Sequence, residues 1–385
     1  MSEKTGVAIL GATGSIGKST LAVIDRHADR FEVVAVTANR SGDELAGLAR
    51  RYRPELAVLA DPSASLPEGG AARWASGREA VLEAAVHPRA GVVVNALVGA
   101  AGLEPTVAAL RAGKRVALAN KESLVCGGGV VLEAAEQGGG ELLPVDSEHS
   151  AALQVLSGES RGNVSRLILT ASGGPFRGYP RERLEKVSPA EALRHPTWEM
   201  GAKITIDSAT LANKALEVIE AHHLFGLPYD RVEAVIHPQS IIHAMVEFVD
   251  GSVLAQMGLP SMELPILYAL SYPDRLGYQP PRFDPVEAGR LTFEPLRREC
   301  FPCFSLGLEA GRAGGTTPAA FNAANEVAVA AFLEGRIPFP GIPTVIEAVL
   351  DGFNAAPLSS LEAALAADGS ARRGAEEALR NLQPG

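Results

Sequence analysis

The segment from Pro144 to Ser150 carries two carboxylates close together in the chain, at Asp146 and Glu148. Val145 is predicted to end a buried strand, and in an extended backbone residues i and i+2 point to the same side. Two carboxylates about 4 Å apart repel by roughly 4 kcal/mol at an effective dielectric of 20. Such a pair holds either a proton or a cation, unless the segment is a solvated loop with two ordinary acids.

A glycine-rich turn, Gly11–Gly17, lies between the first predicted strand and the first predicted helix. Its glycines let backbone amides approach a pyrophosphate, which then rests on the positive end of the helix. The spacing is G-x-x-G-x-x-G rather than the G-x-G-x-x-G fingerprint, so a plain glycine turn is the alternative. Because the turn opens a regular alternation of strands and helices, a dinucleotide site is favoured.

The residues after the second predicted strand indicate which dinucleotide is bound. An acidic residue there bonds the ribose hydroxyls of NAD, whereas a basic residue accommodates the extra phosphate of NADP. This chain has Asn39, Arg40 and Ser41 at that point and no acid. The sequence therefore favours NADP.

Ala119–Ser123 lies where the fifth predicted strand ends and a helix begins. Ligands of doubly wound sheets bind outside the carboxyl ends of the strands. Lys121 is therefore predicted to meet a substrate, and Asn120 or Glu122 the nicotinamide side. An exposed loop lysine is the alternative.

Two later segments are predicted to hold an anion. Thr170–Phe176 follows a strand and combines the Ser172 hydroxyl with glycine amides, which can form an anion nest. Asp207–Glu217 is predicted to leave a strand, Lys203–Ile206, and to enter a helix. On that helix Asn213 and Glu217 are spaced i, i+4, and Lys214 and Glu217 are spaced i, i+3. All three side chains therefore share one face. The residues that could hold a phosphate are Ser172, Ser208, Asn213 and Lys214.

Glu217 could also be a third carboxylate beside Asp146 and Glu148; a capped helix with an internal salt bridge is the alternative. The loop Leu193–Gly201 carries an imidazole, an indole and a thioether, and it also contains a proline and a glycine. Loops of this composition can act as lids that exclude water. A surface loop pinned by one tryptophan is the other interpretation.

The predicted elements explain how these residues would be positioned. Residues 5–145 alternate continuous apolar strands with helical patterns, which indicates a parallel sheet covered on both faces. The strand candidates are Val7–Leu10, Val33–Thr37, Leu56–Leu59, Val92–Ala96, Val116–Ala119 and Leu142–Val145. The helical patterns include Ile16–Arg26, Gly42–Arg51, Leu103–Ala112 and Glu122–Glu136.

The rest of the chain has a different organisation. Residues 146–271 mix strands with helices and predict an α+β domain, with a hairpin around Asp250 and Gly251. The strand candidates are Arg166–Thr170, Lys203–Ile206, Val232–Ile236, Ala244–Val249 and Ser252–Ala255. Residues 272–299 are rich in proline and predict a linker. Residues 300–385 are alanine-rich and predict a helical domain, with one helix starting at Thr317 and Pro318.

Composition limits the class of protein. The 385 residues are 46% hydrophobic and 21% charged, which is a globular composition. A net charge of -10 argues against a sequence-independent grip on nucleic acid but not against a phosphorylated substrate. No apolar run is long enough to span a membrane and no targeting segment is recognisable, so we expect a soluble, cytoplasmic protein. Cys300 and Cys303 lack a second pair and are interpreted as unrelated thiols rather than a redox or zinc site.

Together these segments resemble the 1-deoxy-D-xylulose 5-phosphate reductoisomerase family of the non-mevalonate isoprenoid pathway, over essentially the whole chain. The motifs that carry the resemblance are Gly11–Gly17, Ala119–Ser123, Pro144–His149, Ser172–Phe176, His195–Gly201, Asp207–Glu217, His237–Ser240 and Asn322–Glu326. The resemblance implies a V-shaped homodimer. Each subunit would have an amino-terminal Rossmann-like NADPH domain (1–145), a central α+β catalytic domain (146–271) and a helical carboxy-terminal domain (300–385).

The resemblance also implies a role for individual residues. The ligands of a divalent cation (Mg²⁺, Mn²⁺ or Co²⁺) would be Asp146, Glu148 and Glu217. NADPH would be lined by Thr13, Gly14, Ser15, Ile16, Asn39, Arg40, Asn120, Glu122 and Gly201. The substrate would contact Lys121, Ser147, Glu148, Ser172, His195, Trp198, Ser208, Asn213, Lys214 and Glu217. Lys121, Glu148 and His195 would be catalytic, and a lid would span about residues 178–201.

The implied reaction has two stages. With the metal as a Lewis acid, the carbon skeleton breaks and re-forms by retro-aldol and aldol steps. NADPH then reduces the resulting aldehyde to 2-C-methyl-D-erythritol 4-phosphate. One departure concerns Asn39, Arg40 and Ser41, where other members carry Gly-Lys-Asn; Arg40 can replace a lysine against a phosphate.

Two other functions remain open at this point. Another NADP-dependent dehydrogenase, acting on a phosphorylated or acyl-phosphate substrate, would use the carboxylates only for binding and would need no metal. A non-enzymatic dinucleotide sensor would use the middle domain for a partner and would bind NADPH without metal-dependent turnover.

Overall fold

The computed structural model describes residues 4–67, 71–277 and 281–382. The chain forms two compact units. Unit 1 comprises Met1–Ser123, Val130–Ser150 and Ser261–Tyr278, and unit 2 comprises Leu124–Gly129, Ala151–Pro260 and Gln279–Gly385. Residues 278–280 of the predicted linker lie outside the described residues, as do the extreme ends of the first and last predicted domains.

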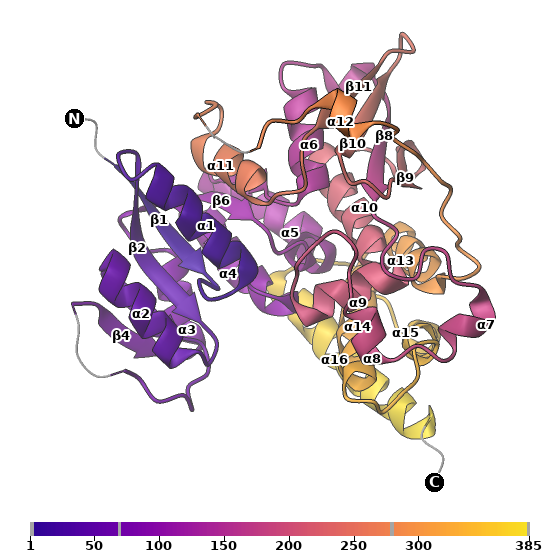
Figure 1. Ribbon diagram of the computed structural model, residues 1–385. Helices are drawn as coiled ribbons and strands as arrows, with labels where there is room; N and C mark the ends of the chain where they lie inside the picture. Colours follow the sequence, from indigo (N-terminus) through magenta and orange to yellow (C-terminus); the bar gives the residue numbers. More distant parts are fainter. Residues whose placement is uncertain (1–3, 68–70, 278–280, 383–385) are drawn as a thin grey trace. The chain divides into compact units, whose positions relative to one another are not determined.

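Unit 1 is built on a seven-stranded parallel sheet with the order β4-β3-β2-β1-β5-β6-β7 (Figure 1). The strands are β1 (Thr5–Leu10), β2 (Phe31–Ala38), β3 (Leu56–Leu59), β4 (Arg73–Ser76), β5 (Ala90–Asn95), β6 (Arg115–Leu118) and β7 (Glu141–Pro144). The predicted parallel sheet is confirmed. The sequence did not predict β4, because the short stretch Arg73–Ser76 has a polar residue at each end and is only partly buried.

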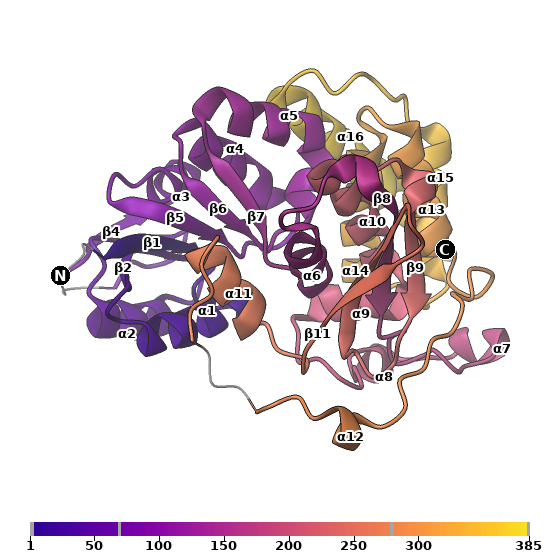
Figure 2. The same cartoon turned by 90° about the horizontal axis from the view of Figure 1, so that it is seen from above.

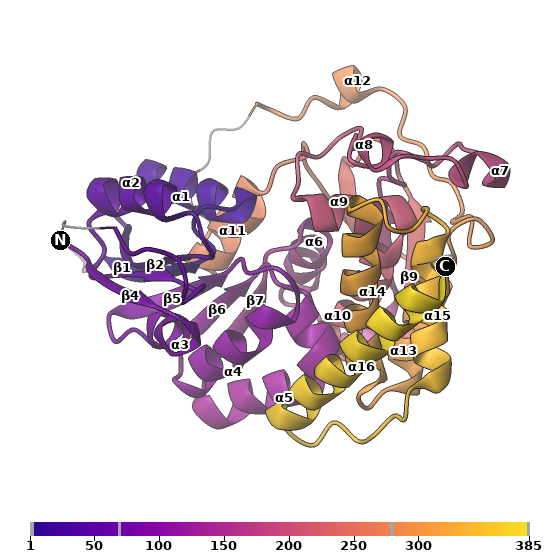
Figure 3. The same cartoon turned by 90° about the horizontal axis from the view of Figure 1, so that it is seen from below.

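Helices cover both faces of this sheet (Figure 3). One face carries α1 (Ser15–Arg26), α2 (Gly42–Tyr52) and α11 (Glu263–Ser271), and the other carries α3 (Arg78–Ala85), α4 (Leu103–Arg111) and α5 (Glu122–Gly138). Arg26 of α1 forms an ion pair with Glu263 of α11. The strands are buried between the helices, so their carboxyl ends at one edge are the place where polar side chains can gather.

Unit 2 contains a four-stranded mixed sheet with the order β11-β10-β8-β9 (Figure 2). Its strands are β8 (Val164–Ala171), β9 (Val232–Ile236), β10 (Ile242–Phe248) and β11 (Val253–Met257). β8 runs parallel to β9 and antiparallel to β10. The predicted hairpin is confirmed, with Gly251 at a φ of +86° between β10 and β11.

The predicted strand Lys203–Ile206 is wrong, because these residues lie in α9 (Ala202–Thr210). Two β-branched isoleucines and a threonine favour a strand by local propensity. In the fold, Ile206 and Ala209 are both buried, and this i, i+3 spacing places them on one helical face. Leu211, with a φ of 60°, then separates α9 from α10 (Ala212–Phe225).

The carboxy-terminal part of unit 2 is helical, as predicted. It consists of α13 (Pro302–Ala313), α14 (Thr317–Leu333), α15 (Gly341–Gly352) and α16 (Leu361–Leu382). The predicted start of a helix at Thr317 is confirmed. Cys300 and Cys303 are free thiols, and burial raises the pKa of Cys303 to about 12. Within the described ranges, we find no helix with the length and apolar character needed to cross a membrane.

Candidate active site

The turn Gly11–Gly17 connects β1 to α1 and is tightly packed. Gly11 has a φ of +89°, and its N–H donates to Thr37 Oγ1 at 3.0 Å. A Cβ atom on Gly17 would lie 2.4 Å from the Gly11 carbonyl oxygen, so only glycine lets α1 begin this close to the turn. The first turn of α1 contains no acidic residue. Its positive end therefore fits the pyrophosphate of a dinucleotide.

The end of β2 presents Arg40 beside Asp61, a residue that sequence reasoning missed. The Arg40 Nε donates to the Asp61 carboxylate. Ser63 donates to the same carboxylate through its N–H at 2.8 Å and its hydroxyl at 2.6 Å. The Ser63 hydrogen bonds, followed by Arg40, lower the pKa of Asp61 to about 2. Asp61 follows β3, which is the neighbour of β2, so the strand order was the signal that could have found it.

Asn120 organises the loop at the carboxyl end of β5. Its amide donates to the carbonyl oxygens of Leu97 at 2.9 Å and Gly99 at 2.8 Å, and its Oδ1 accepts the Ser123 N–H at 3.0 Å. The side chain is fully buried. A Cβ atom on Gly102 would lie 2.3 Å from Asn120 Oδ1. The Asn120 side chain therefore fixes the shape of this loop from within unit 1.

Lys121 and Asp146 form a buried ion pair at the carboxyl ends of β6 and β7, which are adjacent strands. Lys121 is 4% exposed and Asp146 is 8% exposed. Charged side chains are rarely buried to this degree unless they are paired. Lys121 therefore has a charge partner, Asp146, that the sequence did not identify.

The predicted side-by-side arrangement of Asp146 and Glu148 in an extended backbone is wrong. A helix, α6 (Ser147–Leu156), begins immediately after Asp146, and the Ser150 N–H donates to the Asp146 carbonyl at 2.8 Å. Successive helical residues turn by about 100°, so i and i+2 point to different sides. The positive end of the helix stabilises acidic residues at this position, so Asp146 and Glu148 both suit the start of α6.

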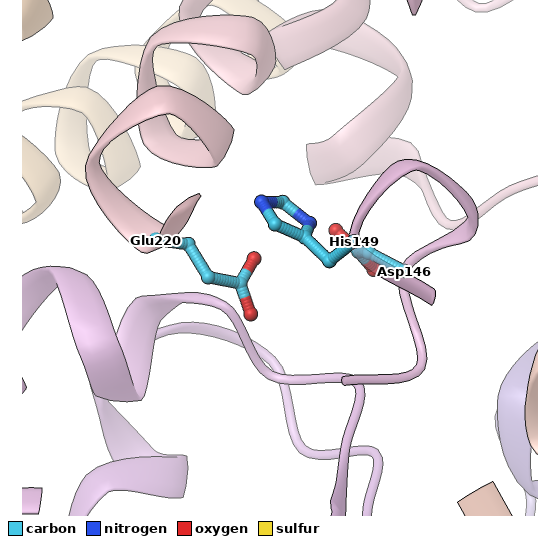
Figure 4. Close-up of side chains that lie close together, drawn as sticks. All are labelled: Asp146, His149 and Glu220. Atoms are coloured by element: carbon cyan, nitrogen blue, oxygen red, sulfur yellow. The ribbon is translucent and has the colours of Figure 1, made fainter. Parts of the chain in front are cut away.

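The donor set at the start of α6 nevertheless suits a hard divalent cation. Figure 4 shows the side chain of Asp146, which directly precedes α6, and that of His149 in the first turn of this helix. Glu148 accepts a hydrogen bond from Ser147 Oγ at 2.6 Å. Each carboxylate has two oxygens and several acceptor positions. Asp146 and Glu148 can therefore bind a cation through oxygen while keeping protein contacts.

In unit 2 the predicted phosphate residues lie around the end of β8. Lys214 and Glu217 of α10 form an ion pair, and Lys214 also donates to the carbonyl of Thr170 in β8. Asn213 donates to the Glu217 carboxylate. The predicted shared face of α10 is thus confirmed. It places the Lys214 ammonium at the segment that continues into Ser172.

Ser208 lies close to the same segment. A Cβ atom on Gly174 would lie 2.7 Å from the Ser208 carbonyl oxygen, so the turn after β8 approaches the end of α9 closely. Gly174 has a φ of +67° and its N–H donates to Ser172 Oγ at 3.2 Å. The structure therefore brings Ser172, Ser208 and Lys214 to one region of unit 2.

His195 in the predicted lid is held in one tautomer. Its Nδ1 accepts the N–H groups of Thr197 at 3.1 Å and Trp198 at 2.9 Å. The ring proton therefore lies on Nε2, which is 2.9 Å from Ser172 Oγ and donates to it. Burial lowers the pKa of His195 to about 4, so the imidazole is neutral near pH 7. Gly201 then precedes the first residue of α9.

Three family models match the chain. The model described as 1-deoxy-D-xylulose 5-phosphate reductoisomerase matches residues 7–128. The model of that enzyme's C-terminal domain matches residues 142–225, and one described as DXP reductoisomerase C-terminal domain matches residues 257–374.

Similar proteins cover nearly the whole length. A 1-deoxy-D-xylulose 5-phosphate reductoisomerase of Symbiobacterium thermophilum is 53% identical, over 97% of this chain and 98% of the relative. One of Thermosynechococcus vestitus is 50% identical, over 98% of this chain and 94% of the relative. The enzyme of Zymomonas mobilis in complex with NADPH is 45% identical, with a TM-score of 0.91 over 99% of this chain and 100% of that chain.

A structure of DOX-P reductoisomerase in complex with NADPH, fosmidomycin and magnesium has a TM-score of 0.92 and 39% identity, over 99% of this chain and 100% of that chain. Sequence similarity and fold agree from the glycine turn to the carboxy-terminal helices. The chain therefore belongs to the 1-deoxy-D-xylulose 5-phosphate reductoisomerase family.

Proposed function

We propose that the protein uses NADPH and a divalent cation to rearrange and reduce 1-deoxy-D-xylulose 5-phosphate to 2-C-methyl-D-erythritol 4-phosphate in the non-mevalonate isoprenoid precursor pathway. The observation that carries the proposal is the buried Lys121–Asp146 pair at the carboxyl ends of β6 and β7. It lies in the unit that also contains the glycine turn. A relative in complex with NADPH, fosmidomycin and magnesium supports the same assignment.

The cofactor is assigned to the carboxyl edge of the unit 1 sheet. The pyrophosphate would rest on the turn before α1, and Arg40 would meet the adenosine phosphate because it is largely exposed beside β2. The residues proposed to line NADPH are Thr13, Gly14, Ser15, Ile16, Asn39, Arg40, Asn120, Glu122 and Gly201. Since the Asn120 amide is occupied by backbone groups, its contribution is to fix the shape of the loop.

The divalent cation is assigned to carboxylates. Asp146, Glu148 and Glu217 are proposed as its ligands, and Mg²⁺, Mn²⁺ and Co²⁺ are all compatible with oxygen donors. When bound, the cation would polarise oxygen atoms of the substrate. Lys121 shares the Asp146 carboxylate and would carry positive charge next to the reacting oxygens. Glu148 would move a proton, and Ser147 would orient it by hydrogen bonding.

The phosphate end of the substrate is assigned to unit 2. Ser172, Ser208, Asn213 and Lys214 would bind it, with Lys214 as the charged donor. His195 donates from Nε2 to Ser172, so its proposed role is to hold the lid and to orient that hydroxyl. Trp198 would exclude water from the closed site.

The domain organisation, the cellular location and the oligomeric state belong to the same proposal. The division into domains 1–145, 146–271 and 300–385 with a linker, the cytoplasmic location and the homodimer all follow from the family resemblance. The edge strand β11 supports the dimer, because Val253, Leu254 and Met257 are exposed apolar residues on a strand with an open edge. Exposed apolar edges are normally covered by another chain or protected.

The test is loss of nicotinamide absorbance when protein, NADPH and 1-deoxy-D-xylulose 5-phosphate are mixed with Mn²⁺ or Mg²⁺. We expect oxidation that stops when a chelator is added and resumes when the metal is restored. Oxidation that continues in the chelator would support another dehydrogenase instead. No oxidation by a preparation that binds NADPH would contradict the proposed reaction.

A further inference from the structure

We propose that Asp61 is a positioning residue that sets the Arg40 guanidinium for the phosphate on the adenosine ribose of NADPH. This inference rests on the proposed use of NADPH. Asp61 itself need not touch the cofactor. It acts through Arg40, whose Nε donates to the Asp61 carboxylate.

The sheet brings these two residues together. β2 and β3 are parallel neighbours, with Ala38 opposite Leu59. The backbone pairing continues past both strand ends, because the Asp61 N–H donates to the Asn39 carbonyl at 3.2 Å. Arg40 therefore leaves β2 at the point where Asp61 leaves β3.

The pair is asymmetric in exposure. The Arg40 side chain is 77% exposed, whereas the Asp61 side chain is 12% exposed. A guanidinium has N–H donors on Nε and on both terminal nitrogens, in a fixed planar fork. Asp61 accepts from Nε, so the terminal nitrogens are the donors that a phosphate in solution can reach.

Asp61 is itself held before any ligand arrives. Ser63 donates to it through both backbone and side chain, and the Ala64 N–H donates to the Asp61 carbonyl at 3.2 Å. A free arginine side chain loses much rotamer freedom when it binds a phosphate. A guanidinium that is already anchored loses less, and affinity increases accordingly.

Electrostatic repulsion would have the opposite effect on NADPH binding, so a titration can distinguish the two. A carboxylate next to a phosphate-binding arginine repels the phosphate and competes for the guanidinium. The direct measurement is calorimetric titration of the protein with NADPH and with NADH, which lacks the ribose phosphate. The variants are Asp61→Ala, Asp61→Asn, Arg40→Ala and the double variant Asp61→Ala/Arg40→Ala.

We expect Asp61→Ala to weaken NADPH binding about fivefold, which corresponds to an exposed ion pair of ordinary strength. NADH binding should not change. Arg40→Ala should weaken NADPH binding about tenfold or more, since it removes a charged donor. The double variant should bind NADPH no more weakly than Arg40→Ala, because Asp61 acts only through Arg40.

The matched control is Asp25→Ala. Asp25 accepts from Arg51 Nη2 at 2.7 Å in another exposed ion pair of unit 1 and should affect neither cofactor. Asp61→Asn keeps an acceptor for Ser63 and tests the charge if Asp61→Ala is unstable. It should weaken NADPH binding less than Asp61→Ala does.

Equal weakening of NADPH and NADH binding by Asp61→Ala would overturn the inference, because it indicates a purely structural role. Tighter NADPH binding would also overturn it, because it indicates repulsion. A wild-type protein that does not prefer NADPH to NADH would also overturn it. The proposed reaction is tested separately, because it fails only if the substrate causes no metal-dependent oxidation of either cofactor.

Discussion

Each unit of the molecule contains a buried pair of a lysine and a carboxylate, but the two pairs are built differently. Lys121 and Asp146 in unit 1 are 4% and 8% exposed, and they join the ends of two adjacent strands. Lys214 and Glu217 in unit 2 are 3% and 2% exposed, and they lie i, i+3 on a single helix. The first pair depends on the register of a sheet, whereas the second depends mainly on one turn of α10.

This difference leads us to expect different roles for the two lysines. A pair formed between strand ends at the edge of a doubly wound sheet lies where ligands bind, so its charges are placed by the topology itself. A pair formed within a helix is fixed by the helix and, here, by the Thr170 carbonyl. We therefore expect changes at Lys121 to affect the chemical step, and changes at Lys214 to affect substrate binding.

The largest effect is expected for Lys121→Ala. If Lys121 has its proposed place next to the reacting oxygens, removing this preorganised charge should lower kcat by about 10³-fold, with a smaller change in the Kd of NADPH. Steady-state kinetics and a cofactor titration would measure both. Arg73→Ala removes a partner from an exposed ion pair of unit 1 and should leave both values unchanged. A variant of Lys121 with normal kcat would contradict the distinction between the two pairs.

Lys214→Met should act mainly on substrate binding. Because Lys214 is proposed as a charged hydrogen-bond donor to the substrate phosphate, its loss should raise the KM for 1-deoxy-D-xylulose 5-phosphate about 30-fold. The Kd of NADPH should stay at the wild-type value. The contrary result is a fall in kcat with an unchanged KM, which would assign Lys214 to the chemical step. Arg336→Ala, which removes a partner from an exposed ion pair of unit 2, is the control.

Gly17→Ala should weaken NADPH binding and leave substrate binding unchanged. The added Cβ would meet the Gly11 carbonyl oxygen at 2.4 Å, and the turn must shift to accommodate it. Overpacking of this kind costs about 1–3 kcal/mol, so NADPH binding should weaken about tenfold. Substrate KM at saturating NADPH should change little. The control is Gly129→Ala, because a Cβ atom added there meets no neighbour within 4 Å. Gly139→Ala is unsuitable, because Gly139 has a positive φ.

The last prediction concerns the pH dependence of stability in unit 2. Burial lowers the pKa values of His195 and His223 to about 4, below the value near 6.5 of an unfolded histidine. Between these values the unfolded chain binds more protons than the folded protein does. The stability that these two neutral histidines contribute should therefore be fully present above pH 6.5, and it should decrease as the pH falls towards 4.

Thermal unfolding at several pH values would measure this dependence. His195→Gln should reduce the slope of Tm against pH below 6.5, because one of the two histidines no longer titrates. An unchanged slope would show that His195 does not take up a proton on unfolding in this range. A wild-type Tm that rises as the pH falls from 6.5 to 4.5 would contradict the predicted direction.

The fold could be predicted from sequence wherever the local pattern and the burial agree. Continuous apolar strands such as Val92–Val94 are buried on both faces, so the pattern and the topology give the same answer. Ala202–Thr210 shows the limit, since isoleucine and threonine favour a strand locally but helical packing of Ile206 prevails. Strand β4 was missed because a short polar edge strand has little apolar pattern to detect.

In the candidate site, contacts within one helix could be predicted from the sequence, whereas contacts between strands could not. The i, i+3 pair of Lys214 and Glu217 follows from spacing on one helix, and an internal salt bridge there was the alternative to the predicted binding roles of these residues. The pair of Lys121 with Asp146 requires knowledge of which strands are neighbours. Asp61 requires the same knowledge, and its contact with Arg40 was not foreseen. Contacts between distant segments therefore depend on strand order, which residue spacing does not contain.

The most direct test of the central claim is turnover and NADPH binding in Asp146→Asn. This substitution keeps the size of the side chain but removes its negative charge, so it should weaken cation binding and disturb the pair with Lys121. We predict an unchanged Kd for NADPH and loss of metal-dependent NADPH oxidation with 1-deoxy-D-xylulose 5-phosphate, partly restored at high metal concentration. Full activity of Asp146→Asn at ordinary metal concentration would contradict the assignment of the reaction to this end of unit 1.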